Sequence, residues 1–129
     1  MPLSNLEILA YDRTPLGILC LRRRRLLHES GSIVTEITLN HEFLMSSYYT
    51  SSERALASIA IETHGGQNLN ILIGGLGLGY TAYEALRSAC VQSVEVVEFL
   101  PQVISWFDKG LIPLSDDLRS DKRLSVVEG

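Results

Sequence analysis

The sequence contains few cysteines and no long hydrophobic run, and both shortages exclude classes of protein. Among its 129 residues there are two cysteines, Cys20 and Cys90. They are too few for a disulfide scaffold or a zinc site, so free thiols in apolar surroundings are expected. No apolar stretch approaches the roughly 20 residues that span a bilayer, and residues 1–5 lack the basic and apolar segments of a signal peptide. We therefore expect no membrane association and a cytoplasmic location.

Positive charge is also scarce in this chain. Its 11 lysine and arginine residues face 15 acidic ones, for a net charge of −4, so no nucleic-acid partner is expected. The one basic run, four arginines at 22–25, does not form a single patch, because alternate residues of a strand point to opposite faces. A solvated strand end is predicted there, with an anion contact as the alternative. His28, His41 and His64 fall at turns without metal-ligand spacing, so they are predicted to be surface residues and no metal is expected.

The first third of the chain predicts a small antiparallel sheet. Short runs rich in branched residues are separated by turn signals, such as Pro15 and Gly17 in one turn and Gly31 in the next. Apolar and polar residues alternate within 33–39, as in a half-buried antiparallel strand. Strands are expected at 8–12, 16–22, 33–39 and 42–45, within a first domain of residues 1–50.

The periodicity changes near Ser52, where a second domain of residues 51–129 is expected. Apolar residues then recur at helical spacing, with Ser51 or Ser52 as the N-cap and Gly65 at the C-terminal end. Ala55, Leu56, Ile59 and Ala60 make up this apolar face. Further on, strands are predicted at 71–73, 94–97 and 124–127, and helices at about 80–89 and from Pro101 onward. This β-α-β-α-β order predicts a parallel sheet with right-handed crossovers.

A glycine-rich turn follows the first of these strands, and a carboxylate ends the second. Gly75, Gly77 and Gly79 precede a helix, and Glu98 closes the next apolar run. Ligands of parallel sheets bind at the carboxyl ends of the strands, so one ligand can contact both features. Glycines allow close approach of the backbone, and a carboxylate can accept hydrogen bonds from both hydroxyls of a ribose. The pattern predicts a nucleoside site. The alternative is that the glycine turn is of a common kind without a ligand and that Glu98 is only an exposed strand end.

The glycine spacing distinguishes among nucleotides. A P-loop requires Lys followed by Ser or Thr after its last glycine, whereas Tyr80 and Thr81 follow Gly79 here. A dinucleotide fingerprint requires a third glycine where Tyr80 stands, which leaves a nicotinamide or flavin oxidoreductase as a minor alternative. The G-x-G-x-G spacing with a distant acidic residue fits an S-adenosyl ligand, because such a ligand has no pyrophosphate.

Residues 71–81 and 94–106 resemble the cofactor half of the spermidine synthase-like group of S-adenosylmethionine-dependent transferases, and residues 14–25 and 39–47 resemble its N-terminal β-domain. The resemblance implies an α/β fold in which a small antiparallel sheet precedes the first half of a Rossmann-like, methyltransferase-type parallel sheet. It also implies that the glycine turn holds the amino-acid part of S-adenosylmethionine or its decarboxylated form. Glu98 would hold the ribose, with Phe99 and residues 128–129 beside the adenine.

Three positions depart from that group. Leu78 stands where its glycine turn carries an acidic residue, Leu44 where it carries a glutamine, and Ser51–Ser52 where it carries a Tyr-His pair. The replaced groups help to hold a polyamine or the charged tail of the cofactor. We therefore expect either aminopropyl transfer or methyl transfer to an amine-type acceptor, and the sequence favours neither reaction over the other. The alternative is a non-enzymatic nucleoside-binding or assembly module with a degenerate site.

The group's general base is an aspartate after a fourth strand, a segment that this sequence does not contain. Asp116 and Asp117 are instead predicted to be a helix cap or a solvated turn, so no catalytic residue is assigned. A complete fold of this class has about seven strands, so we expect an N-terminal part of a longer protein that is inactive by itself. The uncovered sheet edge predicts aggregation or a homodimer.

Overall fold

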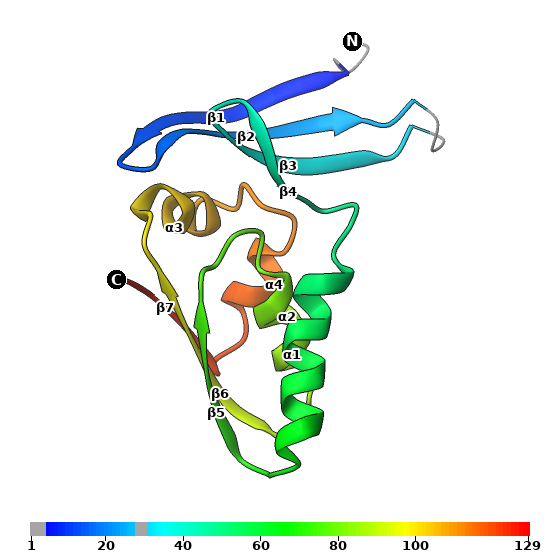
Figure 1. Ribbon diagram of the computed structural model, residues 1–129, viewed down its shortest axis with the longest axis vertical. Coiled ribbons are helices and arrows are strands. Elements are labelled where there is room, and N and C mark those ends of the chain that lie inside the picture. Colours follow the sequence, from blue (N-terminus) through cyan, green and yellow to red (C-terminus); the bar gives the residue numbers. More distant parts are fainter. Residues whose placement is uncertain (1–4, 28–30) are drawn as a thin grey trace. The chain divides into compact units, whose positions relative to one another are not determined.

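The computed structural model in Figure 1 describes residues 5–27 and 31–129. The chain divides into two compact units, Met1–Tyr49 and Thr50–Gly129. The first contains an antiparallel sheet and the second a parallel sheet with helices, so the expected α/β fold class is confirmed. In the part of the chain that is described, no helix has the length and apolar character needed to cross a membrane.

The first unit is a four-stranded antiparallel sheet with the strand order β1-β2-β3-β4. The two residues between β3 and β4, Asn40 and His41, both have positive φ angles, of 50° and 68°. Two-residue hairpin loops favour this conformation, because its twist matches that of the flanking strands. The four expected strands are present, with β1 and β2 longer than predicted: β1 Leu6–Thr14, β2 Gly17–Arg25, β3 Ile33–Leu39 and β4 Glu42–Ser46.

Alternate residues of β2 and β3 give the sheet two different faces. Leu21 pairs with Ile37, and both side chains are buried. On the other face Arg22 pairs with Glu36, which is only 3% exposed. The Nε atom of Arg22 and the Nη2 atom of Arg24 each lie 3.1 Å from a carboxylate oxygen of Glu36. The arginine run therefore has an anion contact inside the sheet at these two positions, where a solvated strand end was the first expectation.

Opposing effects act on the pKa of Glu36. Burial raises the pKa of this carboxyl, but hydrogen bonds from Arg24 and Arg22 and their positive charges outweigh burial and hold it below its ordinary value. A glutamate can thus stay ionised while almost completely removed from solvent.

The second unit contains a three-stranded parallel sheet with the order β5-β6-β7. Val94 and Val96 of the central strand are almost fully buried, as is Leu118 of the last helix. The helix α2 packs on β5 and β6, and α1 packs on α2 (Figure 1). The elements are α1 Ser51–His64, β5 Leu69–Gly74, α2 Tyr80–Leu86, β6 Val91–Glu98, α3 Pro101–Asp108, α4 Ser115–Arg119 and β7 Leu124–Glu128.

The helix α1 differs from expectation at its start and on its buried side. Its N-cap is Thr50 rather than either serine, and the cap residue makes no side-chain hydrogen bond to the helix backbone. The side chains of Leu56 and Ile59 are 66% and 61% exposed, whereas Ala57 is buried. The helix α1 packs mainly on α2, and Ala57 is its one buried residue, while Leu56 and Ile59 remain exposed.

The segment around Asp116 and Asp117 forms a short helix, where a cap or a solvated turn was predicted. Both aspartates lie in the first turn of α4, where negative charge interacts favourably with the backbone dipoles. Leu118 anchors the helix in the core, with 1% of its side chain exposed. A helix of five residues is too short to show the periodicity from which longer helices are predicted.

Candidate nucleoside site

The glycine turn joins β5 to α2 in a conformation that side chains disfavour. Gly75, Gly77 and Gly79 have φ angles of 94°, 53° and 89°, in the left-handed region that L-residues rarely adopt. A Cβ atom on Gly79 would lie 2.5 Å from Cδ1 of Leu118, whereas one on Gly75 would meet no atom within 4 Å. Gly79 therefore permits close packing of α4, and Gly75 leaves open space beside the turn.

The side chains of the two leucines within the turn are buried in the core and do not face a ligand. Leu76 and Leu78 are only 5% and 3% exposed. Their burial holds the turn against the core and leaves its backbone, rather than its side chains, for contact with a ligand. The position at which the family resemblance would place an acidic group is thus occupied by a side chain that belongs to the core.

Glu98 connects the glycine turn to the segment that follows β6. Its Oε1 atom accepts a hydrogen bond from the N–H of Leu76, and its Oε2 atom accepts one from the N–H of Leu100, both at 2.9 Å. The residue is 7% exposed, so it is not the exposed strand end that was the alternative. Each carboxylate oxygen has a second lone-pair direction, which leaves acceptor capacity for the hydroxyls of a bound sugar.

The ends of β6 and β7 complete this edge of the sheet. Glu98 pairs with Glu128 across the two strands, and the N–H of Gly129 donates to the carbonyl oxygen of Glu98 at 3.0 Å. Phe99 is 55% exposed and presents an aromatic side chain directly after the carboxylate. The structure thus brings the glycine turn, Glu98 and the start of the following segment together at the carboxyl edge, where ligands of such sheets bind.

A groove beside β5 is separate from these residues. It is a largely apolar groove of about 380 Å³ between α1 and β5, and it contains neither the residues of the glycine turn nor Glu98. Leu72 of the edge strand β5, one of its lining residues, is 71% exposed. The remaining lining residues are Leu56, Ala57, Ala60, Ile61, His64, Leu69, Asn70, Ile71, Ile73, Gly74 and Thr81.

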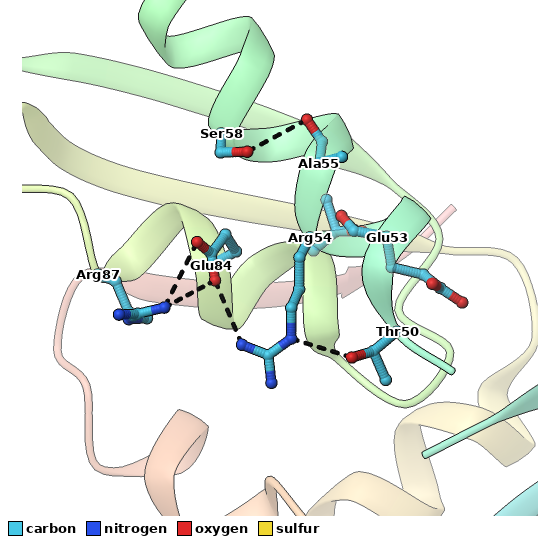
Figure 2. Close-up of polar contacts among 8 residues, drawn as sticks. Thr50, Glu53, Arg54, Ala55, Ser58, Glu84 and Arg87 are labelled. Atoms are coloured by element: carbon cyan, nitrogen blue, oxygen red, sulfur yellow. Dashed lines mark hydrogen bonds and ion pairs between the residues drawn. The ribbon is translucent and has the colours of Figure 1, made fainter. Parts of the chain in front are cut away.

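The helices α1 and α2 hold a charged cluster that the sequence analysis did not identify (Figure 2). The guanidinium of Arg54 lies 5.3 Å from the ring centre of Tyr80 and 5.5 Å from that of Tyr83. Its Nε donates to Oγ1 of Thr50 at 3.0 Å, and its Nη1 lies 3.4 Å from Oε2 of Glu84. These partners are up to 30 residues apart, so no local pattern could have indicated the cluster.

The structure also describes several other residues that the sequence analysis considered. His41 and His64 are exposed, and Nδ1 of His64 accepts a hydrogen bond from the N–H of Gly66 at 3.2 Å. His28 lies outside the described residues. Tyr48 and Tyr49 contact each other edge to face. Within residues 5–27 and 31–129, no group of three or more His, Cys, Asp or Glu side chains is placed to hold a metal ion.

No protein-family model and no curated protein matches this sequence. Solved structures do match its fold. One is the spermidine synthase from Thermotoga maritima, and another is a spermidine synthase in complex with the transition state analogue AdoDATO. Each has a TM-score of 0.75 and 18% sequence identity, over 95% of this chain and 40% of the other. The chain therefore has the fold of a part of spermidine synthase, and it spans 40% of the length of those proteins.

Proposed function

We propose that this chain is the nucleoside-binding part of a spermidine synthase-like transferase. It binds S-adenosylmethionine or the decarboxylated form, and the complete protein transfers a methyl or aminopropyl group to an amine-type acceptor. The observation that carries the proposal is the Glu98 carboxylate, which is buried and hydrogen-bonded to the backbone of the glycine turn. The spermidine synthase with AdoDATO supports it, since a protein of the same fold is in complex with a transition state analogue.

The residues at this edge fit such a nucleoside chemically. The free lone pairs of Glu98 can accept hydrogen bonds from the two ribose hydroxyls. The open space beside Gly75 admits the ligand close to the backbone, and Phe99 supplies an exposed aromatic face for the adenine. The bound sulfonium would supply an electrophilic carbon. The chain's own contribution is then to hold and orient the nucleoside relative to an acceptor.

A second candidate function is a non-enzymatic binding or assembly module, which the apolar groove favours. Leu72 and Leu56 are largely exposed around it, and β5 is an edge strand of its sheet. Unpaired edges with apolar side chains tend to associate with a further strand. Under this candidate, two copies form a homodimer through β5. Light scattering should then show concentration-dependent dimers that Leu72→Lys weakens.

Titration calorimetry with S-adenosylmethionine, its decarboxylated form, methylthioadenosine and NAD tests the transferase proposal. We expect at least one adenosyl-sulfur ligand to bind. Glu98→Ala should weaken that binding by a factor of about 10 or more, because hydrogen bonds to a charged group are lost. Glu95→Ala is the matched control, since Glu95 is an exposed glutamate of the same strand. Circular dichroism checks that each variant is folded. Absence of binding to the folded chain would favour the assembly module, and binding of NAD alone would contradict the family resemblance.

A further inference from the structure

The glycine turn provides no charge to a ligand, although the two candidate nucleosides differ in charge. Residues 75–79 consist of glycine and leucine only. The amino-acid tail of S-adenosylmethionine carries an ammonium and a carboxylate, whereas the tail of the decarboxylated form carries an ammonium alone. A charged group that leaves water needs a partner of opposite charge or several hydrogen bonds. The side chains next to the turn therefore determine which tail is accepted.

Arg54 is held against the start of α2, directly after the last glycine of the turn. Two independent contacts place it there. The guanidinium packs on the ring of Tyr80, the first residue of α2, and Oγ1 of Thr81 donates to the carbonyl oxygen of Glu53 at 2.9 Å. Because Glu53 precedes Arg54, this hydrogen bond joins the first turns of the two helices. The cation is thus held against α2, the helix that begins directly after the turn.

The charge of Arg54 is only partly balanced. Glu84 is its ion-pair partner at 3.4 Å, but Glu84 also pairs with Arg87, at 3.2 Å. Arg54 and Arg87 share this one ion-pair partner, and the side chain of Arg54 is 36% exposed. Of the five N–H donors of a guanidinium, its hydrogen bonds to Thr50 and Glu84 use two. Packing on two aromatic rings orients the cation without neutralising it.

We propose that Arg54 binds the carboxylate of the donor's amino-acid tail, so that the site prefers S-adenosylmethionine to its decarboxylated form. This inference rests on the proposed nucleoside site. With the adenine beside Phe99 and the ribose at Glu98, the 5′ tail extends over the glycine turn toward α2. A carboxylate there can accept the free N–H donors of Arg54. The tail of the decarboxylated form brings only a second cation, which Arg54 repels.

Calorimetry with three ligands tests the role of Arg54: S-adenosylmethionine, its decarboxylated form, and methylthioadenosine, which has no charged tail. The unmodified chain should bind S-adenosylmethionine more tightly than the decarboxylated form. Arg54→Met removes the charge and keeps an unbranched side chain. It should weaken the binding of S-adenosylmethionine by about tenfold, which is the size of one charge-assisted hydrogen bond. The affinity for methylthioadenosine should stay unchanged. Arg54→Lys should retain part of the preference.

Lys122→Met is the control, because Lys122 is exposed, lies outside the charged cluster and precedes β7, at the end of that strand away from Glu128. It should leave the ratio of the two affinities unchanged. Equal or tighter binding of the decarboxylated form by the unmodified chain would overturn the inference, even if the Arg54→Met variant did not fold. An unchanged ratio in folded Arg54→Met would also overturn it. In both cases, methylthioadenosine binding that depends on Glu98 would leave the proposed function intact, whereas absence of all binding would contradict both.

Discussion

Among the described residues, each unit of the molecule buries one glutamate, and the two are stabilised in different ways. Glu36 in the antiparallel sheet contacts the guanidinium groups of Arg22 and Arg24. Glu98 at the edge of the parallel sheet accepts hydrogen bonds from the backbone N–H groups of Leu76 and Leu100. Both carboxylates are less than a tenth exposed. The charge of Glu36 is thus balanced by arginines within its own sheet. Glu98 is held by backbone hydrogen bonds, and its oxygens can still accept further hydrogen bonds from a ligand.

The largest effect is expected from removal of the charge partners of Glu36. The double variant Arg22→Met/Arg24→Met leaves a buried carboxylate without a counter-charge, which costs about 3 to 5 kcal/mol of unfolding free energy at neutral pH. Urea unfolding measures this change. Arg23→Met is the control, because Arg23 is exposed between the two and should change the stability by less than about 0.5 kcal/mol. A similar loss in the double variant and the control would show that the ion pairs contribute nothing.

The glycine turn that Glu98 contacts packs closely on α4, and Gly79→Ala tests that packing. The added methyl group would be strained at a φ of 89° and would overlap Leu118, so a loss of about 2 to 4 kcal/mol is expected. Gly110→Ala is the control, because Gly110 has a φ of 74° but open space around it. Its expected cost is about 1 to 2 kcal/mol, from backbone strain alone. Equal losses in thermal or urea unfolding would contradict the close packing of α4 on the turn.

A smaller effect is expected from Glu98→Gln. The amide has one acceptor oxygen, so it can satisfy the N–H of Leu76 or that of Leu100 but not both. One buried donor without a partner costs about 1 to 2 kcal/mol. Hydrogen exchange should show faster exchange at one of these two amides in the absence of ligand. Glu95→Gln should leave both exchange rates unchanged, and protection of both amides in Glu98→Gln would show that the carboxylate does not bridge the two segments.

The smallest effect concerns the contribution of Glu36 to stability at acid pH. The pKa of Glu36 is lowered in the folded state, so the unfolded state binds more protons around its ordinary pKa of about 4.3. The stability from Glu36 is therefore present above that pH and is lost as the pH falls through the lower, folded-state value. Glu36→Gln should make the unfolding free energy less dependent on pH between about 5 and 3. An unchanged slope would contradict the proposed charge pairing.

Local sequence patterns predicted most elements of the fold. Alternation in 33–39 indicated β3, and the continuous apolar residues at 71–73 indicated β5. Their burial differs from these patterns: residues 34–38 of β3 are all buried rather than half-buried in alternation, and Leu72 of the edge strand β5 is 71% exposed. The patterns failed where burial depends on a distant partner. Leu56 and Ile59 fall at helical spacing yet are exposed, since α1 packs through Ala57 on α2. The short helix α4 is held by Leu118 in the core, which no local period could reveal.

The sequence alone determined the order of strands and helices, the glycine turn, and a carboxylate at the end of β6. These features depend on spacing within about 25 residues and on backbone preferences. The tertiary structure decided that Glu98 is hydrogen-bonded to the turn, that Glu36 is paired with two arginines, and that Arg54 lies beside Tyr80. The physical reason is that partners from separate elements become neighbours only when those elements pack, and their spacing in the chain carries no signal of that contact.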